Sequence, residues 1–149
     1  RDFPRYFCTP LQATIIARLG VDGIHYCIVK GDHDLDNSPV YVISPMMPDH
    51  YVELVSRNLI DFISLLVKCK DATALECISY MTEDGFNRHI DEIRMEIIKS
   101  PEYNEKIEKA ILSLKSQFEL REIDNIYEYI KEIKSAPEYQ TKLLFSQEY

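Results

Sequence analysis

The sequence predicts an α+β fold: a small antiparallel β-sheet in the N-terminal half, packed by α-helices, with a helical C-terminal region. Two observations lead to this prediction. Residues 13–44 show the alternation and turn signals of short strands, whereas apolar residues after Asn58 recur at helical spacing. Apolar residues make up 46% of the 149 residues, which is enough for a hydrophobic core.

The strands are expected to surround one tight turn and one longer loop. Residues 13–18 form the first candidate strand, and residues 24–29 return from a turn at 20–23 that holds two glycines and an Asp-Gly pair. Residues 40–44 form the third strand, which is ended by a proline. Three strands make a small sheet for this length, so a further strand near residues 6–7, or a preceding N-terminal segment, is expected to complete it.

Five amphipathic helices are expected after the strands, and each has an identifiable start or apolar stripe. The first can be capped by Ser56 or Asn58. The next three begin at polar residues suited to the N-cap position, the last of them followed by a proline that fits the first helical residue: Asp71, Thr82 and Ser100. The fifth is indicated by the stripe Ile123, Ile126, Tyr127, Ile130 and Ile133. We therefore expect a core of residues 1–81 and a helical extension, residues 82–149, packed on it.

Charge and cysteine content restrict the partners and the compartment. The chain has 25 acidic and 17 basic side chains, a net charge of −8, which disfavours nucleic acid and membranes as partners and is compatible with a basic protein. No run of about 18 apolar residues is present, so no membrane-spanning helix is expected. The cysteines lack CxxC spacing and are expected to be reduced thiols in a cytoplasmic protein: Cys8, Cys27, Cys69 and Cys77. Because the first residue is Arg1, we expect the chain to be a piece of a longer protein.

An acidic loop, residues 30–39, is the predicted binding surface. Its aspartates are spaced like the start of a calcium loop, but the sixth and twelfth positions are not the glycine and glutamate that such a loop needs. No metal site is therefore predicted there, and the carboxylates are expected to form a negative patch that steers a basic partner. The predicted partner-binding residues are Asp32, His33, Asp34, Asp36, Tyr26 and Tyr41.

A small enzyme is the least favoured function class. His25 and Cys27 share a strand face, but side chains at such positions stand parallel and do not converge as a nucleophile and its base must. A metal site built from these two residues with His33 and His50 matches no zinc-ligand spacing. Sequence motifs for phosphate cradles, zinc proteases and nucleophile elbows are absent. No catalytic residue, metal or cofactor is predicted.

Part of the N-terminal half resembles the SUKH superfamily of Smi/Knr-like proteins. The resemblance rests on the turn at residues 20–23, the strand at 24–29, the Val-Tyr strand within 38–43 and the helix opening at 55–66. It implies an α+β fold with helices packed on a bent antiparallel sheet, and it makes residues 1–81 the SUKH-like core. It also implies similarity to bacterial immunity proteins, which bind and neutralise toxins, often nucleases, and are not enzymes as a class.

These observations leave three functions to compare. The first is a non-enzymatic protein-binding domain, an immunity protein that neutralises a basic, nuclease-type toxin. The second is a structural or regulatory interaction protein that acts through the helices after Thr82. The third is a small enzyme that uses His25 and Cys27. The acidic charge and the family resemblance favour the first, while the sequence identifies neither the partner nor the oligomeric state.

Overall fold

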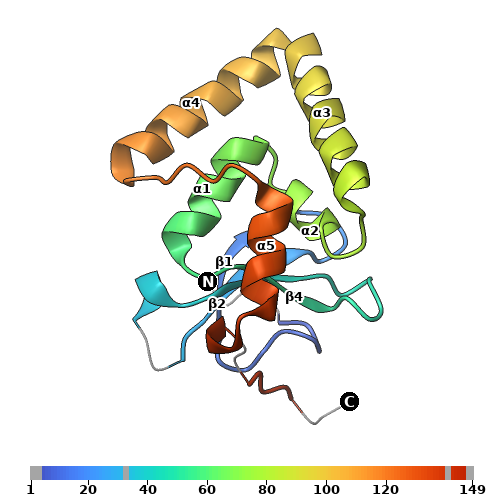
Figure 1. Cartoon of the computed structure of the whole chain (residues 1–149), viewed down its shortest axis with the longest axis vertical. Coiled ribbons are helices and arrows are strands. Elements are labelled where there is room, and N and C mark those ends of the chain that lie inside the picture. The colour runs from blue at the N-terminus through green and yellow to red at the C-terminus, as the bar shows by residue number, and fades with distance from the viewer. Residues whose placement is uncertain (1–4, 32–33, 140–141, 147–149) are drawn as a thin grey trace.

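The computed structural model of the chain describes residues 5–31, 34–139 and 142–146 and has the predicted α+β architecture (Figure 1). Four strands come first and the main helices follow. The strands are β1 (Ala13–Arg18), β2 (His25–Val29), β3 (Val40–Ile43) and β4 (Val52–Ser56). The helices are α1 (Leu59–Cys69), α2 (Ala74–Cys77), α3 (Glu83–Lys99), α4 (Pro101–Gln117) and α5 (Ile126–Ser135), with short 3-10 helices η1 (Leu35–Asn37) and η2 (Pro137–Tyr139).

The sheet is an antiparallel meander in which each strand pairs with the next one along the chain, in the order β1-β2-β3-β4. The turn predicted at residues 20–23 joins β1 to β2, and Gly20, Asp22 and Gly23 adopt the positive φ angles that a tight turn requires. Every residue of β2 and β3 is buried. These two strands therefore form the centre of the core.

The sequence pattern does not predict β4, and the strand expected near residues 6–7 is not formed. A hydrogen bond from the Thr9 amide to the Tyr6 carbonyl (2.9 Å) closes a turn there. Residues 52–56 complete the sheet instead by pairing with β3, with a shift of register between Val40 and Tyr41. β4 escaped the prediction because it is a short edge strand that carries the half-buried charge of Glu53 and follows a proline-rich loop.

The two faces of the sheet are covered by different parts of the chain, as the alternation of β2 predicts. Tyr26 faces α1, where its ring lies 4.9 Å from the Phe62 ring, and its hydroxyl donates to the Ala72 carbonyl. His25 points to the opposite face, where its ring stacks on Tyr6 at 5.7 Å. Helices therefore cover one face, and the irregular N-terminal segment covers part of the other.

Most helix starts follow the predicted caps. The Asn58 side chain accepts from the Asp61 amide at the start of α1 (2.8 Å), and Thr82 accepts from the Gly85 amide at the start of α3 (3.1 Å). The helix predicted from Asp71 begins later and is only α2. Asp71 accepts from the Thr73 amide instead (2.6 Å), a local turn that competes with helix initiation.

One hydrophobic core joins the two predicted parts of the chain. It contains residues of β2, β3 and α1 together with Phe86, Ile90 and the buried face of α5. The boundary after residue 81 therefore does not divide the core. The part that extends away from it is the hairpin of α3 and α4, which diverge from Ser100 above α1 (Figure 1). No helix in the described part of the chain is long and apolar enough to cross a membrane.

Candidate functional site

The predicted acidic loop is only partly covered by the described residues. Asp34 and Asp36 are exposed, while Asp32 and His33 lie outside the described residues. Asp34 also has a local role, because its Oδ1 accepts from the backbone amide (3.0 Å) and the side-chain amide (2.8 Å) of Asn37 at the start of η1. The carboxylate of Asp36 is exposed at the surface.

The two tyrosines predicted to contact a partner are buried, and this part of the prediction is corrected. Tyr26 is 0% exposed and packs under α1, as described above. Tyr41 is 6% exposed, and its hydroxyl donates to the carbonyl of Tyr139 in η2 (3.5 Å). Both rings sit on central strands, which the chain covers on both sides, so neither contributes to the outer surface.

His25 and Cys27 do not form a reactive pair. His25 Nδ1 lies 2.7 Å from the Gly23 carbonyl and Nε2 lies 3.2 Å from Thr9 Oγ1, so local groups occupy both ring nitrogens. Burial lowers the pKa of His25 and raises the pKa of the Cys27 thiol to about 12. The thiol therefore stays protonated at neutral pH, whereas a nucleophile needs the thiolate.

A second thiol and imidazole, on α2 and α3, lie next to each other. Cys77 Sγ is 3.7 Å from His89 Nε2 and 3.3 Å from the Tyr80 hydroxyl. Burial raises the pKa of the Cys77 thiol, and the adjacent Glu76 carboxylate raises it further. A carboxylate beside a thiol opposes thiolate formation. Cys77 and His89 are therefore placed like a Cys-His catalytic dyad, but their surroundings do not favour the thiolate that such a dyad needs.

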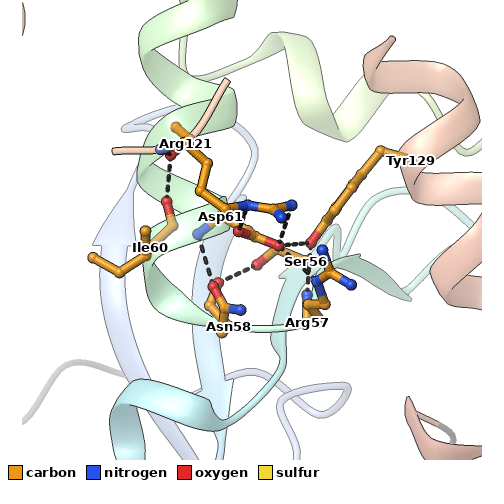
Figure 2. Close-up of polar contacts among 8 residues, drawn as sticks. Ser56, Arg57, Asn58, Ile60, Asp61, Arg121 and Tyr129 are labelled. Carbon is orange, nitrogen blue, oxygen red and sulfur yellow. Dashed lines mark hydrogen bonds and ion pairs between the residues drawn. The ribbon is translucent and has the colours of Figure 1, made fainter. Parts of the chain in front are cut away.

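A polar cluster surrounds the buried carboxylate of Asp61 in the first turn of α1 (Figure 2). Asp61 is 1% exposed. Its Oδ2 accepts from the Tyr129 hydroxyl (2.6 Å), from Arg57 Nε (2.8 Å) and from Arg121 Nη2 (3.2 Å). Its Oδ1 has no aligned hydrogen-bond donor among the described residues but is compensated by the charge of Arg121, whose Nε lies 2.7 Å away. The carboxylate is thus enclosed by two guanidinium groups and a phenol.

The Asp61 cluster joins parts of the chain that are distant in sequence. Arg57 follows β4, Arg121 lies in the segment between α4 and α5, and Tyr129 belongs to α5. The Arg121 amide also donates to Ser64 Oγ (2.9 Å), which fixes the same segment to α1. Burial raises the pKa of Tyr129, with Asp61 adding to the shift, so the hydroxyl stays protonated and donates to the carboxylate.

The chemistry of this cluster is that of a structural joint. A buried carboxylate is costly unless it is paired, and here each oxygen already has a partner. No reacting atom is left free for acid or base work, and the geometry instead fixes how the C-terminal segments sit on α1. Nothing in the sequence pattern indicates it except a charged residue, Asp61, inside an apolar stretch.

The joint positions an open groove between α4 and α1. Lys70 Nζ pairs with Glu108 of α4 (2.8 Å), and Arg121, after the end of α4, reaches Asp61. A groove of about 420 Å³ separates α4 from α1 and the β1–β2 turn, and Lys70 is among the residues that line it. Its apolar lining is Leu19, Leu66, Val67, Ile107, Ile111 and Leu114. Because its lining is largely apolar, this groove is the candidate binding site on the described surface.

Neither metal sites nor known proteins add to this picture. Among the described residues, no three His, Cys, Asp or Glu side chains lie close enough together to hold a metal ion. No family model, curated protein or solved structure matches the chain. The resemblance to the SUKH superfamily therefore stays a prediction.

Proposed function

We propose that the chain is a non-enzymatic protein-binding domain. The observation that carries this proposal is the uncovered apolar face of α4, a helix of 17 residues of which only Ile111 is buried. Tyr103 and Ala110 of α4 are exposed and line the groove opposite α1, where Ile107 and Leu114 are only partly buried. Apolar surface that a folded chain leaves open on a groove is typical of a recognition site.

A basic protein is the proposed partner, and an immunity-type role against a nuclease-type toxin is the proposed biological setting. The net charge of −8 supports this, because complementary charge speeds encounter and rejects acidic competitors. Asp34 and Asp36 add exposed carboxylates at η1. A toxin that binds nucleic acid carries the cationic surface that such carboxylates attract.

A structural or regulatory interaction protein that acts through its C-terminal helices is the second candidate. The α3–α4 hairpin favours it, because Met95, Ile98 and Leu112 are exposed there outside the groove. An enzyme has less support, because burial raises the pKa of both Cys27 and Cys77, the two thiols considered as nucleophiles.

The proposal is tested with the basic protein encoded beside the gene for this chain, if one is found there. Association is followed by stopped-flow mixing over a range of salt concentrations. Replacing Asp32, Asp34 and Asp36 by Asn is expected to slow association and flatten its salt dependence, because charges screen over about 8 Å at physiological salt and mainly affect encounter.

The matched control removes the same charge elsewhere. Glu119, Glu132 and Glu138 are exposed, and their replacement by Gln changes the net charge equally. If both triple variants slow association to the same degree, the acidic loop has no special role. If a purified complex never forms and the chain instead turns over a substrate, the binding function is wrong.

A further inference from the structure

We propose that the groove between α1 and α4 binds an amphipathic helical segment of the partner, with basic residues at the end that lies against α3. This inference rests on the proposed protein-binding function and names the chemistry that the groove recognises. Two adjoining depressions carry it, one apolar and one acidic.

The apolar depression is the groove of about 420 Å³ described above. Besides its aliphatic residues it is lined by Ala110 and Tyr103, both exposed on α4. Two helices, α1 and α4, form its long walls, and a groove between helices is the usual receptor for the apolar face of a third helix. The apolar residues of such a helix recur along one face and would fill the groove in a row.

The acidic depression, of about 300 Å³, adjoins the first one, because Asp71 and Tyr103 line both. Three carboxylates face it: Asp71, Glu92 and Glu96. Within the described part of the chain no lysine or arginine lines it, although His89 does, and Lys99 Nζ lies 3.2 Å from Glu96 Oε1. The apolar groove thus leads into a site of negative charge.

The charges at the two ends of the combined groove differ. Arg18 and Lys70 line the apolar part, where Lys70 is already paired with Glu108. Of the carboxylates that line the two depressions, Glu92 and Glu96 belong to α3, and Asp71 lies where the depressions adjoin. A bound helix is therefore oriented, with its basic residues beside Glu92 and its apolar face between Ile107 and Leu66.

The experiment uses a synthetic amphipathic helix of about 18 residues, five turns, with leucine on one face and lysine on the flanks at one end. Its fluorescence anisotropy is measured on titration with the whole chain. A second peptide has glutamate in place of lysine. The leucine–lysine peptide is expected to bind, and the leucine–glutamate peptide to bind at least about tenfold more weakly, because like charges repel at the α3 end.

Matched variants locate the binding. Ala110→Arg places a long charged side chain in the groove wall and is expected to weaken binding about tenfold or more. Leu112→Arg makes the same charge change on α4 at a 66% exposed position that does not line the groove, and is expected to change affinity less than about twofold. Glu92→Gln is expected to weaken binding several-fold, and Glu132→Gln on α5 not to do so.

Three results would overturn the inference. In the first, the leucine–lysine peptide does not bind, or Ala110→Arg and Leu112→Arg act equally. In the second, both peptides bind with equal affinity, which removes the basic specificity. In the third, sedimentation shows a dimer of the free protein that Ala110→Arg breaks, because the occupant is then a second copy. The association experiment with a basic protein tests the proposed function separately. A basic protein can still bind through the acidic loop when the peptide does not bind in the groove.

Discussion

α4 and α5 carry the same kind of amphipathic pattern, yet the fold uses them differently. α5 has ten residues and buries four of them, Ile126, Tyr129, Ile130 and Ile133. α4 has 17 residues and buries only Ile111. α5 packs on β4, and its Tyr129 hydroxyl donates to Asp61. α4 instead lies opposite α1 across an open groove. A stripe of apolar residues therefore predicts that a helix forms, without predicting what covers its face.

The largest expected effect separates the two helices directly. Ile130→Ala on α5 should reduce the free energy of unfolding by about 2–5 kcal/mol, because Ile130 is 1% exposed and its removal leaves a cavity in the core. The same change at Ile107 on α4 should cost less than about 1 kcal/mol, because the side chain borders an open groove. Urea unfolding followed by circular dichroism measures both. Equal losses would mean that α4 is part of the core.

The next effect tests the joint that fixes α5. Asp61→Asn keeps the shape of the side chain but removes the charge that pairs with Arg57 and Arg121. We expect a loss of about 2–3 kcal/mol, less than for a fully buried pair, because the two arginine side chains are 35% and 46% exposed and water screens them.

The control for Asp61 is another aspartate paired with an arginine. Asp91→Asn removes a carboxylate that is 73% exposed and 3.7 Å from Arg94, and should change the unfolding free energy by less than about 0.5 kcal/mol. A loss at Asp61 no larger than the loss at Asp91 would show that the cluster does not hold α5.

The effect that is smallest at neutral pH is a pH dependence that arises in the core and not in the α3–α4 hairpin. Burial raises the pKa values of Cys27 and Cys69 to about 12, well above their ordinary value, and residues 83–117 contain no cysteine. Above the ordinary pKa the unfolded thiols lose protons that the folded thiols keep. Unfolding is then favoured, and stability falls by about 1.4 kcal/mol per pH unit for each thiol until the pH nears 12.

Single variants isolate this contribution. Cys69→Ala should make the decline of stability with pH shallower than in the unchanged chain, although buried tyrosines, whose pKa values are also raised, add to the decline above about pH 10. Urea unfolding at several alkaline pH values measures the slope. An unchanged slope in Cys69→Ala would contradict the burial of that thiol.

The fold was more predictable than the site, and particular residues explain why. The β1–β2 turn follows from its glycines, and the starts of α1 and α3 follow from Asn58 and Thr82, because these are local effects of one residue on its own backbone. The edge strand β4 was missed because it is short and the charged Glu53 interrupts its apolar residues. Local signals thus gave the elements and their order.

The site depended on contacts between distant residues. Asp61 meets Arg121 and Tyr129 across 60 and 68 positions, and no spacing rule connects such residues. Tyr26 and Tyr41 are predicted to contact a partner, since aromatic rings suit interfaces. A tyrosine on a central strand can equally be buried in the core when its hydroxyl donates to a backbone carbonyl, as both of these do. Burial was the missing information in each case.

The meander also determines the order in which the molecule can assemble. Its strands are joined by short connections, so their pairing closes small loops at little entropic cost. The bond between Tyr129 and Asp61 closes a loop of 68 residues and forms later, because contacts between distant residues are slow to find. During synthesis on the ribosome, the residues of the sheet and α1 leave the ribosome before those of α5. The face of β4 that α5 covers in the folded protein is therefore exposed to water and to other chains until α5 has been synthesised.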